Sequence, residues 1–333
     1  MKVGMYGGKF LPFHNGHANM INLCAEQVDK LYVVVSSSER RDRSICARDS
    51  IKYMPGEVRA SWIGRWSNSR DSIVVLNIVD EWGEEDYDWW KGAEMIVEAI
   101  PEKITHIFSS EPDYDKFFRN FYNAEHRVLD PKRSKVPISA TEIRQNLVDN
   151  IDHLPYYVAS FFVKKIAIVG TESCGKSTLA EKLAKYYKTE FVPEAGRYFC
   201  DEYSNQLTVE MFDDIAMMHP IAVKVKNEHA NHLLFIDSEA VITQYYLNMY
   251  FGETSSLIDE IIKKQDFDLV LYLEPDVPWV DDGIRFAGKE EERKKNNVYL
   301  KELYAIYGIQ YKIIDGDWEE RFQKAVSLID NLD

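Results

Sequence analysis

The chain has 333 residues, of which 45% are hydrophobic, and its formal net charge is −15 at pH 7. This length predicts two domains, and the acidic balance argues against general binding of nucleic acids. No run of residues is long enough for a membrane span or has the pattern of a signal peptide. The 4 cysteines show no paired spacing, which predicts a reducing, cytoplasmic location and neither zinc nor haem.

The first motif follows a predicted strand at residues 2–6 and leads into a predicted helix. Glycines let a nucleotide approach the backbone closely, and two histidines three residues apart can face one spot beside the positive end of a helix. That spot suits a triphosphate, although such a pair also occurs on plain surfaces and in metal sites. The residues expected to bind ATP here are Gly7, Gly8, Lys9, Phe10, His14 and His17.

A group of arginines follows the next predicted strand, at residues 31–35. It consists of Arg40, Arg41, Arg43 and Arg48, and a second basic group, which precedes or begins the later helix, consists of Lys132, Arg133, Lys135 and Arg144. At the end of a strand these side chains could form a positive funnel for anionic substrates. For any single arginine, a solvated face with scattered ion pairs is the better interpretation.

The segment at residues 137–144 places hydroxyl groups and an arginine ahead of a helical stretch. Ser139 or Thr141 would cap this helix and bind phosphate oxygens, while Arg144 would meet the charge that develops in a transition state. The spacing of Ser139 and Glu142 also fits a plain capping box. We predict that Ser139, Thr141 and Arg144 complete the first ATP site.

The predicted domain boundary follows the last helical pattern of the first half, which Pro155 ends. We expect domains at residues 1–157 and 158–333. Both are expected to be α/β, with doubly wound parallel sheets and with sites at the carboxyl ends of the strands.

The second motif, at residues 170–177, fits the P-loop pattern G-x-x-x-x-G-K-[ST] at every fixed position and lies between a strand and a helix. In such a loop, backbone N–H groups surround the phosphates. Lys176 would reach the β- and γ-phosphate oxygens, and the hydroxyl of Ser177 would bind Mg²⁺. The predicted ATP ligands here are Gly170, Thr171, Ser173, Gly175, Lys176, Ser177 and Thr178.

A carboxylate follows an apolar strand at residues 232–236. Asp237 would hold Mg²⁺ through water or accept a proton from the attacking hydroxyl group, and Glu239 competes for either role. An acid in this place is also common as a helix cap. Paired with the P-loop, Asp237 is predicted to serve as a metal and catalytic residue.

Together these motifs resemble a known family. The Gly-Lys-Phe-x-Pro-x-His-x-Gly-His start and the Ile-Ser-x-x-x-Ile-Arg segment resemble the nicotinamide mononucleotide (NMN) adenylyltransferases of the nucleotidyltransferase superfamily. With the P-loop half, the chain resembles the NadR-type bifunctional NMN adenylyltransferases and ribosylnicotinamide kinases. The resemblance extends from about residue 2 to about residue 325 and includes residues 193–197 and 278–285. It implies a Rossmann-like nucleotidyltransferase domain followed by a P-loop kinase domain.

Two departures from the family pattern have consequences. Many members begin with a helix-turn-helix domain, whereas this chain starts at the adenylyltransferase strand, so sequence-specific DNA binding is not expected. The tyrosine that is usual between the glutamate and the glycine of residues 194–196 is Ala195 here. This difference changes one corner of the expected nucleoside pocket.

The resemblance also implies roles for individual residues. Arg285, on a closing lid, would stabilise the transferring phosphoryl group, and Asp237 or Glu194 would align the attacking hydroxyl. The substrate contacts that it implies are Trp89, Trp90, Arg133, Glu194, Arg197, Trp279 and Asp282.

An aromatic residue of residues 80–90 is expected to stack on the nicotinamide ring of NMN, which is favourable by about 0.5–2 kcal/mol. The candidates are Trp82, Tyr87, Trp89 and Trp90, of which two could simply fill the core.

The predicted function is therefore a bifunctional NAD salvage enzyme with Mg²⁺ as its cofactor. The small molecules that it would bind are ATP, nicotinamide riboside, NMN and NAD. A nucleotide-sensing regulator with weak turnover, or an enzyme with the same folds and another small substrate, are the alternatives. The sequence leaves open a homo-oligomer, feedback by NAD and the relative activity of the two halves.

Overall fold

The computed structural model describes residues 1–68, 70–111, 115–204, 206–276 and 290–332. The chain folds into two compact units, Met1–Phe161 (unit 1) and Phe162–Asp333 (unit 2). The boundary predicted after residue 157 lies slightly earlier, inside helix α8 (Tyr156–Ala159). Each unit is an α/β layer with a five-stranded sheet, which confirms the predicted fold class. In the described part of the chain, no helix is long and apolar enough to cross a membrane.

The sheet of unit 1 is parallel and has the strand order β3-β2-β1-β4-β5. Its strands are β1 (Val3–Gly8), β2 (Lys30–Ser37), β3 (Ile73–Val79), β4 (His106–Ser109) and β5 (Glu125–Val128). Strand β2 is a continuous apolar run that is buried on both faces, as expected of a parallel strand covered by helices. The strand order reverses direction at β1, and this reversal predicts a ligand crevice at the carboxyl end of β1.

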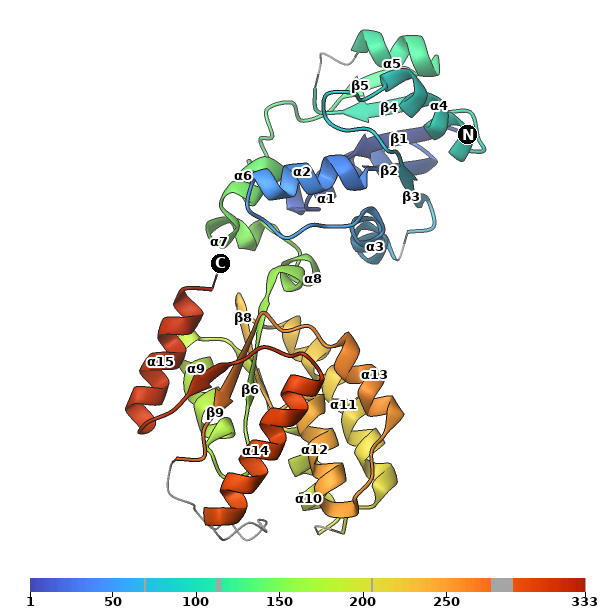
Figure 1. Ribbon diagram of the computed structural model, residues 1–333. Coiled ribbons are helices and arrows are strands. Elements are labelled where there is room, and N and C mark those ends of the chain that lie inside the picture. The colour runs from blue at the N-terminus through green and yellow to red at the C-terminus, as the bar shows by residue number, and fades with distance from the viewer. Residues whose placement is uncertain (69, 112–114, 205, 277–289, 333) are drawn as a thin grey trace. The chain divides into compact units, whose positions relative to one another are not determined.

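Helices cover both faces of the unit 1 sheet (Figure 1). They are α1 (Asn15–Ala25), α2 (Glu39–Arg48), α3 (Gly56–Ser67), α4 (Trp89–Ala99), α5 (Asp115–Tyr122), α6 (Ala140–Gln145), α7 (Leu147–Asn150) and α8, with the short 3₁₀ helices η2 (Ile151–His153) and η3 (Ser160–Phe162). On one face, Ala93 of α4 and Tyr122 of α5 pack against Val3 and Met5 of β1. Helices α1 and α3 contact the strands from the other face.

The sheet of unit 2 is also parallel, with the order β10-β9-β6-β8-β7 and with β6 at its centre. Its strands are β6 (Lys164–Val169), β7 (Glu190–Val192), β8 (Leu233–Asp237), β9 (Leu269–Leu273) and β10 (Lys312–Ile314). Alternate residues of β6 enter two different cores. Ile166 and Ile168 lie in one core, and Ala167 and Val169 lie in the other. Strand β6 therefore needs apolar side chains on both faces.

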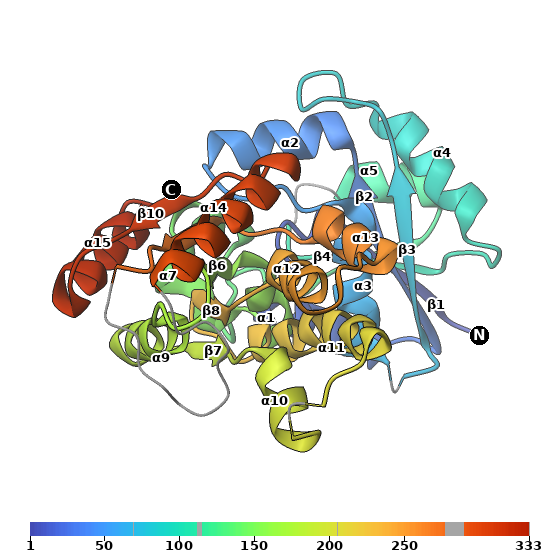
Figure 2. The same ribbon diagram turned by 60° about the horizontal axis from the view of Figure 1, so that its bottom comes forward.

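The helices of unit 2 form one layer on each side of its sheet (Figures 1 and 2). They are α9 (Lys176–Tyr187), α10 (Ala195–Glu202), α11 (Val209–Asn227), α12 (Ala240–Phe251), α13 (Ser256–Lys264), α14 (Glu290–Ile306) and α15 (Trp318–Asp330). Helices α9 and α15 pack on one face, and residues of α11 to α14 form the core on the other. The carboxyl ends of β6 and β8 open between these layers, next to the start of α9.

Candidate active sites

The two histidines of the first motif lie together at the start of α1. His14 is the N-cap of this helix, and its Nδ1 atom accepts a hydrogen bond from the backbone N–H of Gly16 at 3.0 Å. The ring centroids of His14 and His17 are 3.8 Å apart. Because Nδ1 of His14 is an acceptor, its neutral ring carries the proton on Nε2 and can donate it to an oxygen of a ligand.

Both rings are uncharged at neutral pH. Burial, with a smaller effect of nearby Arg133, lowers the pKa of His14 to about 3. Burial and the neighbouring His14 hold the pKa of His17 well below its usual range. The Nδ1 atom of His17 is buried and has no hydrogen-bond partner among the described residues. The pair therefore offers neutral hydrogen-bonding groups, rather than positive charge, beside the helix end.

A buried ion-pair network, which the sequence analysis missed, supports the loop before α1. The side chain of Arg59 on α3 is fully buried and donates hydrogen bonds to the backbone carbonyl of Lys9 and to Asp42. Arg41 pairs with Asp80 at 3.1 Å, and its Nε atom lies 3.5 Å from Asp42. No sequence motif connects these positions. Their contacts fix the backbone of the predicted ATP-binding loop.

The other arginines of the group that follows β2 also have carboxylate partners. Arg40 pairs with Asp86 and Arg48 with Glu84, each at 2.9 Å. Arg43 pairs within α2, and Arg41 belongs to the buried network. This arrangement fits the alternative interpretation, an ion-paired surface, better than a funnel for anions.

The segment at α6 combines the two interpretations of its sequence. Ser139 caps α6 in a complete capping box with Glu142. The guanidinium group of Arg144 donates to Asp49 at 2.6 Å, to the carbonyl of Leu11 at 2.7 Å and to Thr141 at 3.1 Å. The segment therefore braces the loop before α1, and phosphate contacts of Ser139, Thr141 and Arg144 remain a prediction.

The aromatic candidates gather between the end of β3 and α4. The ring centroid of Trp89 lies 5.1 Å from that of Tyr87 and 5.1 Å from that of Phe117. Trp89 is 46% and Trp90 62% exposed, so neither fills the core. A shallow pocket beside them is lined by Glu85, Asp86, Tyr87, Asp88, Trp89, Trp90 and Phe117. Its acidic and aromatic lining suits a flat cation.

The P-loop of unit 2 has the backbone that its sequence predicts. Gly170 has a φ of +145° and Gly175 a φ of +90°, where residues with side chains are strained. A Cβ atom on Gly175 would also lie 2.5 Å from the ring of Trp318. The hydroxyl groups of Thr171 and Ser173 are buried and have no partner within the described residues. Ser173 also lines the pocket beside the P-loop, where the motif predicts phosphate groups.

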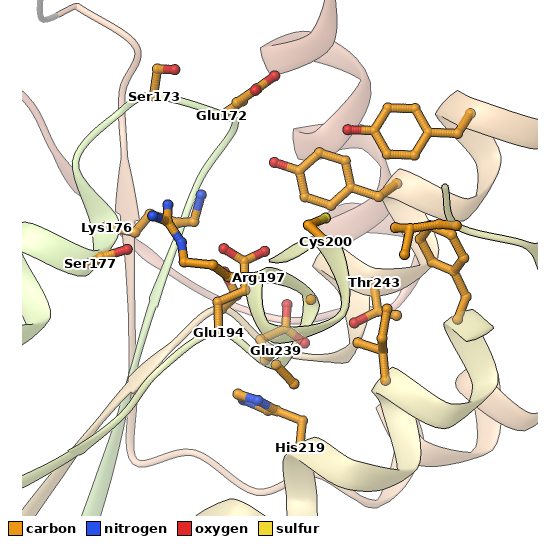
Figure 3. A pocket seen from close by; sticks show the side chains of 18 of the residues that line it. Glu172, Ser173, Lys176, Ser177, Glu194, Arg197, Cys200, His219, Glu239 and Thr243 are labelled. Atoms are coloured by element: carbon orange, nitrogen blue, oxygen red, sulfur yellow. The ribbon is translucent and has the colours of Figure 1, made fainter. Parts of the chain in front are cut away.

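Charged groups from three elements meet at the P-loop (Figure 3). Lys176 is 7% exposed, and its Nζ atom donates to the carbonyl of Thr171 at 3.1 Å. Burial opposes its charge, but Cys174, Glu194 and Asp237 outweigh this effect and raise the pKa of Lys176. The ammonium group therefore stays charged at neutral pH, as phosphate binding requires.

Asp237, at the end of β8, has an unusual environment for a carboxylate. Burial and nearby Glu194 raise its pKa to about 6, although Lys176 and a hydrogen bond from Ser177 act in the opposite direction. The hydroxyl group of Ser177 thus lies near this carboxylate, and the role of the two residues as Mg²⁺ ligands stays a prediction. Their oxygen atoms are the ligand type that Mg²⁺ prefers.

The three candidates for the acid that aligns the attacking hydroxyl group differ in their surroundings. Glu239 caps α12 and accepts hydrogen bonds from the N–H of Val241 and from the side chains of Gln265 and Tyr304. These structural contacts occupy its oxygens. Glu194 precedes α10 without a side-chain cap bond and lines the pocket with Arg197.

The P-loop opens into a pocket of about 450 Å³, a size typical of small-molecule sites. Its far wall comes from α11 and α12 and includes Phe212, Tyr246 and Tyr250. The rings of Tyr246 and Tyr250 are stacked, with centroids 5.6 Å apart. The sequence analysis missed this wall, although the spacing of four residues between the tyrosines places them on one side of a helix.

Arg321 is a further residue that sequence patterns did not reveal. It is 1% exposed and donates to the carbonyls of Cys174 in the P-loop and Glu274 after β9, each at 2.6 Å. It also donates to the carbonyl of Gly316 at 2.9 Å. One guanidinium group therefore holds three loops in place around the nucleotide site.

Three predicted residues of the kinase half lie outside the described residues. They are Trp279, Asp282 and Arg285. The predicted ATP ligands Gly175, Lys176, Ser177 and Thr178 and the predicted substrate ligands Glu194 and Arg197 all line the same pocket.

Comparisons with known proteins agree with this architecture. Residues 5–146 match the cytidylyltransferase-like family model, and residues 165–321 match the AAA domain model. The chain superimposes with a TM-score of 0.80 on the crystal structure of NadR protein in complex with NR, at 22% identity over 99% of this chain and 96% of that one. A crystal structure of NadR protein in complex with NAD and AMP-PNP gives a TM-score of 0.78 at 21% identity, with the same coverage.

The sequence relatives extend over both units. The trifunctional NAD biosynthesis/regulator protein NadR of Escherichia coli K12 is 30% identical over 98% of this chain and 82% of its own length. The NadR protein of Salmonella typhimurium is 29% identical over 99% of this chain and 83% of its own length. A nicotinamide-nucleotide adenylyltransferase of Saccharolobus solfataricus is 49% identical over 12% of this chain. With a nucleotidyltransferase-like unit and a P-loop unit in one polypeptide, the chain belongs to the NadR family and is an enzyme.

Proposed function

We propose that this protein is a bifunctional enzyme of NAD salvage. Unit 2 phosphorylates nicotinamide riboside to NMN, and unit 1 transfers the adenylyl group of ATP to NMN, which gives NAD and pyrophosphate. The observation that carries the proposal is the unit 2 pocket, where the P-loop faces a wall of aromatic and acidic side chains. This wall suits a nucleoside with a flat cationic ring, and the names of the NadR relatives support the same assignment.

The kinase reaction follows from the charges at the P-loop. The 5′-hydroxyl of the riboside attacks the γ-phosphorus of ATP, the bond to the β–γ bridging oxygen breaks, and ADP leaves with the bonding electrons. Lys176 and the backbone N–H groups of the loop stabilise the charge on the transferring group. Glu194 aligns the attacking hydroxyl and accepts its proton, since Glu239 is occupied by structural contacts. Arg285 is proposed to stabilise the charge of the same phosphoryl group.

Ser177 and Asp237 are the proposed ligands of Mg²⁺, Asp237 acting directly or through water. The effect of Ser177 on the pKa of Asp237 supports a shared ligand beside the P-loop. When bound, Mg²⁺ would neutralise charge on the β- and γ-phosphate oxygens. The raised pKa of Asp237 makes its carboxylate a strong acceptor for a nearby cation.

The adenylyl transfer needs no protein nucleophile. The 5′-phosphate of NMN attacks the α-phosphorus of ATP in line, and pyrophosphate leaves. Nε2–H of His14 donates to a phosphate oxygen, and His17 completes the contact from the next turn of α1. Lys9 lies in the supported loop and meets the negative charge that develops on the leaving group.

The pocket beside Trp89 and Trp90 is the proposed site of the nicotinamide ring of NMN. Its acidic residues, Asp86 and Asp88 among them, attract the positive ring, while an indole covers one face of it. Arg133 is the proposed partner of the NMN phosphate, because it acts electrostatically on both histidines.

One assay tests both activities. Purified protein is incubated with nicotinamide riboside and Mg-ATP, and NMN and NAD are separated by chromatography. The expected result is transient NMN followed by NAD and pyrophosphate. Protein that binds ATP but forms neither product would contradict the proposal and favour a nucleotide sensor.

A further inference from the structure

The unit 2 pocket contains a polar side chain that the P-loop chemistry does not use. His219 lies on α11, is 8% exposed and points into the pocket (Figure 3). Its Nε2 atom is buried and has no hydrogen-bond partner in the described part of the chain. The other residues that α11 contributes to the pocket are the apolar Phe212 and Ile215. A polar atom thus interrupts an apolar helix face at the point where that face meets the pocket.

This arrangement is unfavourable in the absence of a partner. A buried nitrogen without a hydrogen bond loses its contact with water and gains nothing in return. Buried polar groups in native proteins are paired in the great majority of cases. An apolar residue of similar size would continue the face formed by Phe212 and Ile215 without this cost. The position of His219 therefore indicates a partner that belongs to the ligand.

The surroundings of His219 also bear on the kind of hydrogen-bond partner that its ring can take. Burial lowers the pKa of His219, so that the ring is neutral at pH 7, while Asp237 and a hydrogen bond with the backbone of Ser238 oppose this effect. A neutral imidazole ring has one nitrogen that carries the proton and one that accepts a hydrogen bond. We assign the acceptor role to Nε2, the buried nitrogen that has no partner among the described residues.

We propose that Nε2 of His219 accepts a hydrogen bond from the nucleoside bound by unit 2 and thereby selects substrates with a donor at that position. The proposal rests on the proposed kinase function. Nicotinamide riboside carries such donors on its carboxamide group and on its ribose ring. A site built to pair with a donor rejects an analogue that lacks it, because the buried acceptor is then left unpaired.

Two variants of His219 test this contact. His219→Phe keeps an aromatic ring without the acceptor, and His219→Gln keeps a side-chain acceptor. We expect His219→Phe to raise the KM for nicotinamide riboside roughly five- to tenfold, with little change in kcat or in the KM for ATP. His219→Gln should recover part of this loss. The exposed His229, which follows α11, gives the matched control His229→Phe.

Substrate analogues then identify the donor. Nicotinic acid riboside lacks the carboxamide N–H, and the 2′-deoxy and 3′-deoxy ribosides each lack one hydroxyl group. In the natural protein, the analogue without the critical donor should have a higher KM than nicotinamide riboside. In His219→Phe the same analogue should have about the same KM as nicotinamide riboside. This coupling between variant and analogue is expected of a direct contact. Equal penalties in both proteins for every analogue, or an unchanged riboside KM in His219→Phe, would overturn the contact and leave the kinase function standing. No riboside phosphorylation by the natural protein would instead refute the proposed function.

Discussion

In unit 1, the segment from β1 to α1 carries two neutral imidazole rings, and its loop is held by the guanidinium group of Arg59, which has a carboxylate partner. In unit 2, the corresponding segment from β6 to α9 carries the charged Lys176, on which Glu194 and Asp237 from other elements act electrostatically. Both segments connect the central strand of a five-stranded parallel sheet to a helix. The same local geometry therefore supports two different electrostatic environments.

The two predicted ATP sites therefore differ in how their charges affect stability. In unit 1 buried ion pairs hold the backbone of the loop before α1, and the two histidine rings at the helix end are neutral. In unit 2 the residue predicted to bind phosphate, Lys176, is itself charged. Burial and mutual repulsion destabilise the ionised forms of the nearby acids. We therefore expect unit 1 to lose stability when a charge is removed, and unit 2 to gain it.

The largest expected effect is on the stability of unit 1. Arg59→Met should lower its free energy of unfolding by about 3–5 kcal/mol, because Asp42 would be left buried without this partner. Thermal unfolding of the variant, followed by calorimetry, measures the loss. Arg43→Met removes an exposed pair and is the control, with an expected cost of about 0–1 kcal/mol. Equal stability of the two variants would show that the buried network does not support the loop.

Reciprocal variants separate the two activities. Lys176→Ala should lower NMN formation from the riboside about 10²–10³-fold, because a contact that stabilises the transition state is lost. Its formation of NAD from supplied NMN should persist. Lys185→Ala, exposed on the same helix, is the matched control. A parallel loss of both activities in folded Lys176→Ala would contradict separate sites.

His17→Ala is the mirror experiment in unit 1. It should lower adenylyl transfer about 10²-fold while the kinase continues, so that NMN accumulates. Turnover should fall more than ATP affinity, since the contact strengthens as charge develops on pyrophosphate. Loss of activity to a zinc-selective chelator in excess Mg²⁺ would instead identify the histidines as metal ligands.

Asp237→Asn should stabilise unit 2 while it abolishes kinase activity. The folded-state pKa of Asp237 lies above its usual value, so protonation favours the fold. That stability is fully present below about pH 4 and is lost as the pH rises through about 6. At pH 7.5 the neutral amide should therefore add about 1–3 kcal/mol, and the gain should shrink toward pH 5. Denaturant unfolding at the two pH values measures both quantities, and a destabilised variant at pH 7.5 would contradict this assignment.

The smallest expected effects concern how the kinase activity and the charges of the two histidines depend on pH. The kcat/KM of the kinase should fall below about pH 6 as Asp237 becomes protonated in the free enzyme. The rings of His14 and His17, by contrast, should not titrate between pH 5 and 8 in NMR spectra of the free protein. A midpoint near 6.5 for either ring would show that it is solvated and can carry charge.

The sequence by itself determined the two folds and the two loops at which nucleotide sites are predicted. Each glycine-rich loop between an apolar strand and a helix is a local pattern, so residues 7–17 and 170–177 could be assigned without knowledge of distant contacts. The acid at the end of β8 was also predictable, because parallel strands end at the same edge of a sheet. These features depend on neighbours in the chain.

Only the tertiary structure decided which charged groups are paired and which face a ligand. Arg59 and Asp42, or Arg321 and Cys174, are far apart in sequence, and no periodicity predicts that they meet. His219 is unremarkable as one residue of a long helix, and its role becomes visible only where that helix borders the pocket. Burial and pairing are set by packing between elements, whereas a single sequence shows only the pattern within each one.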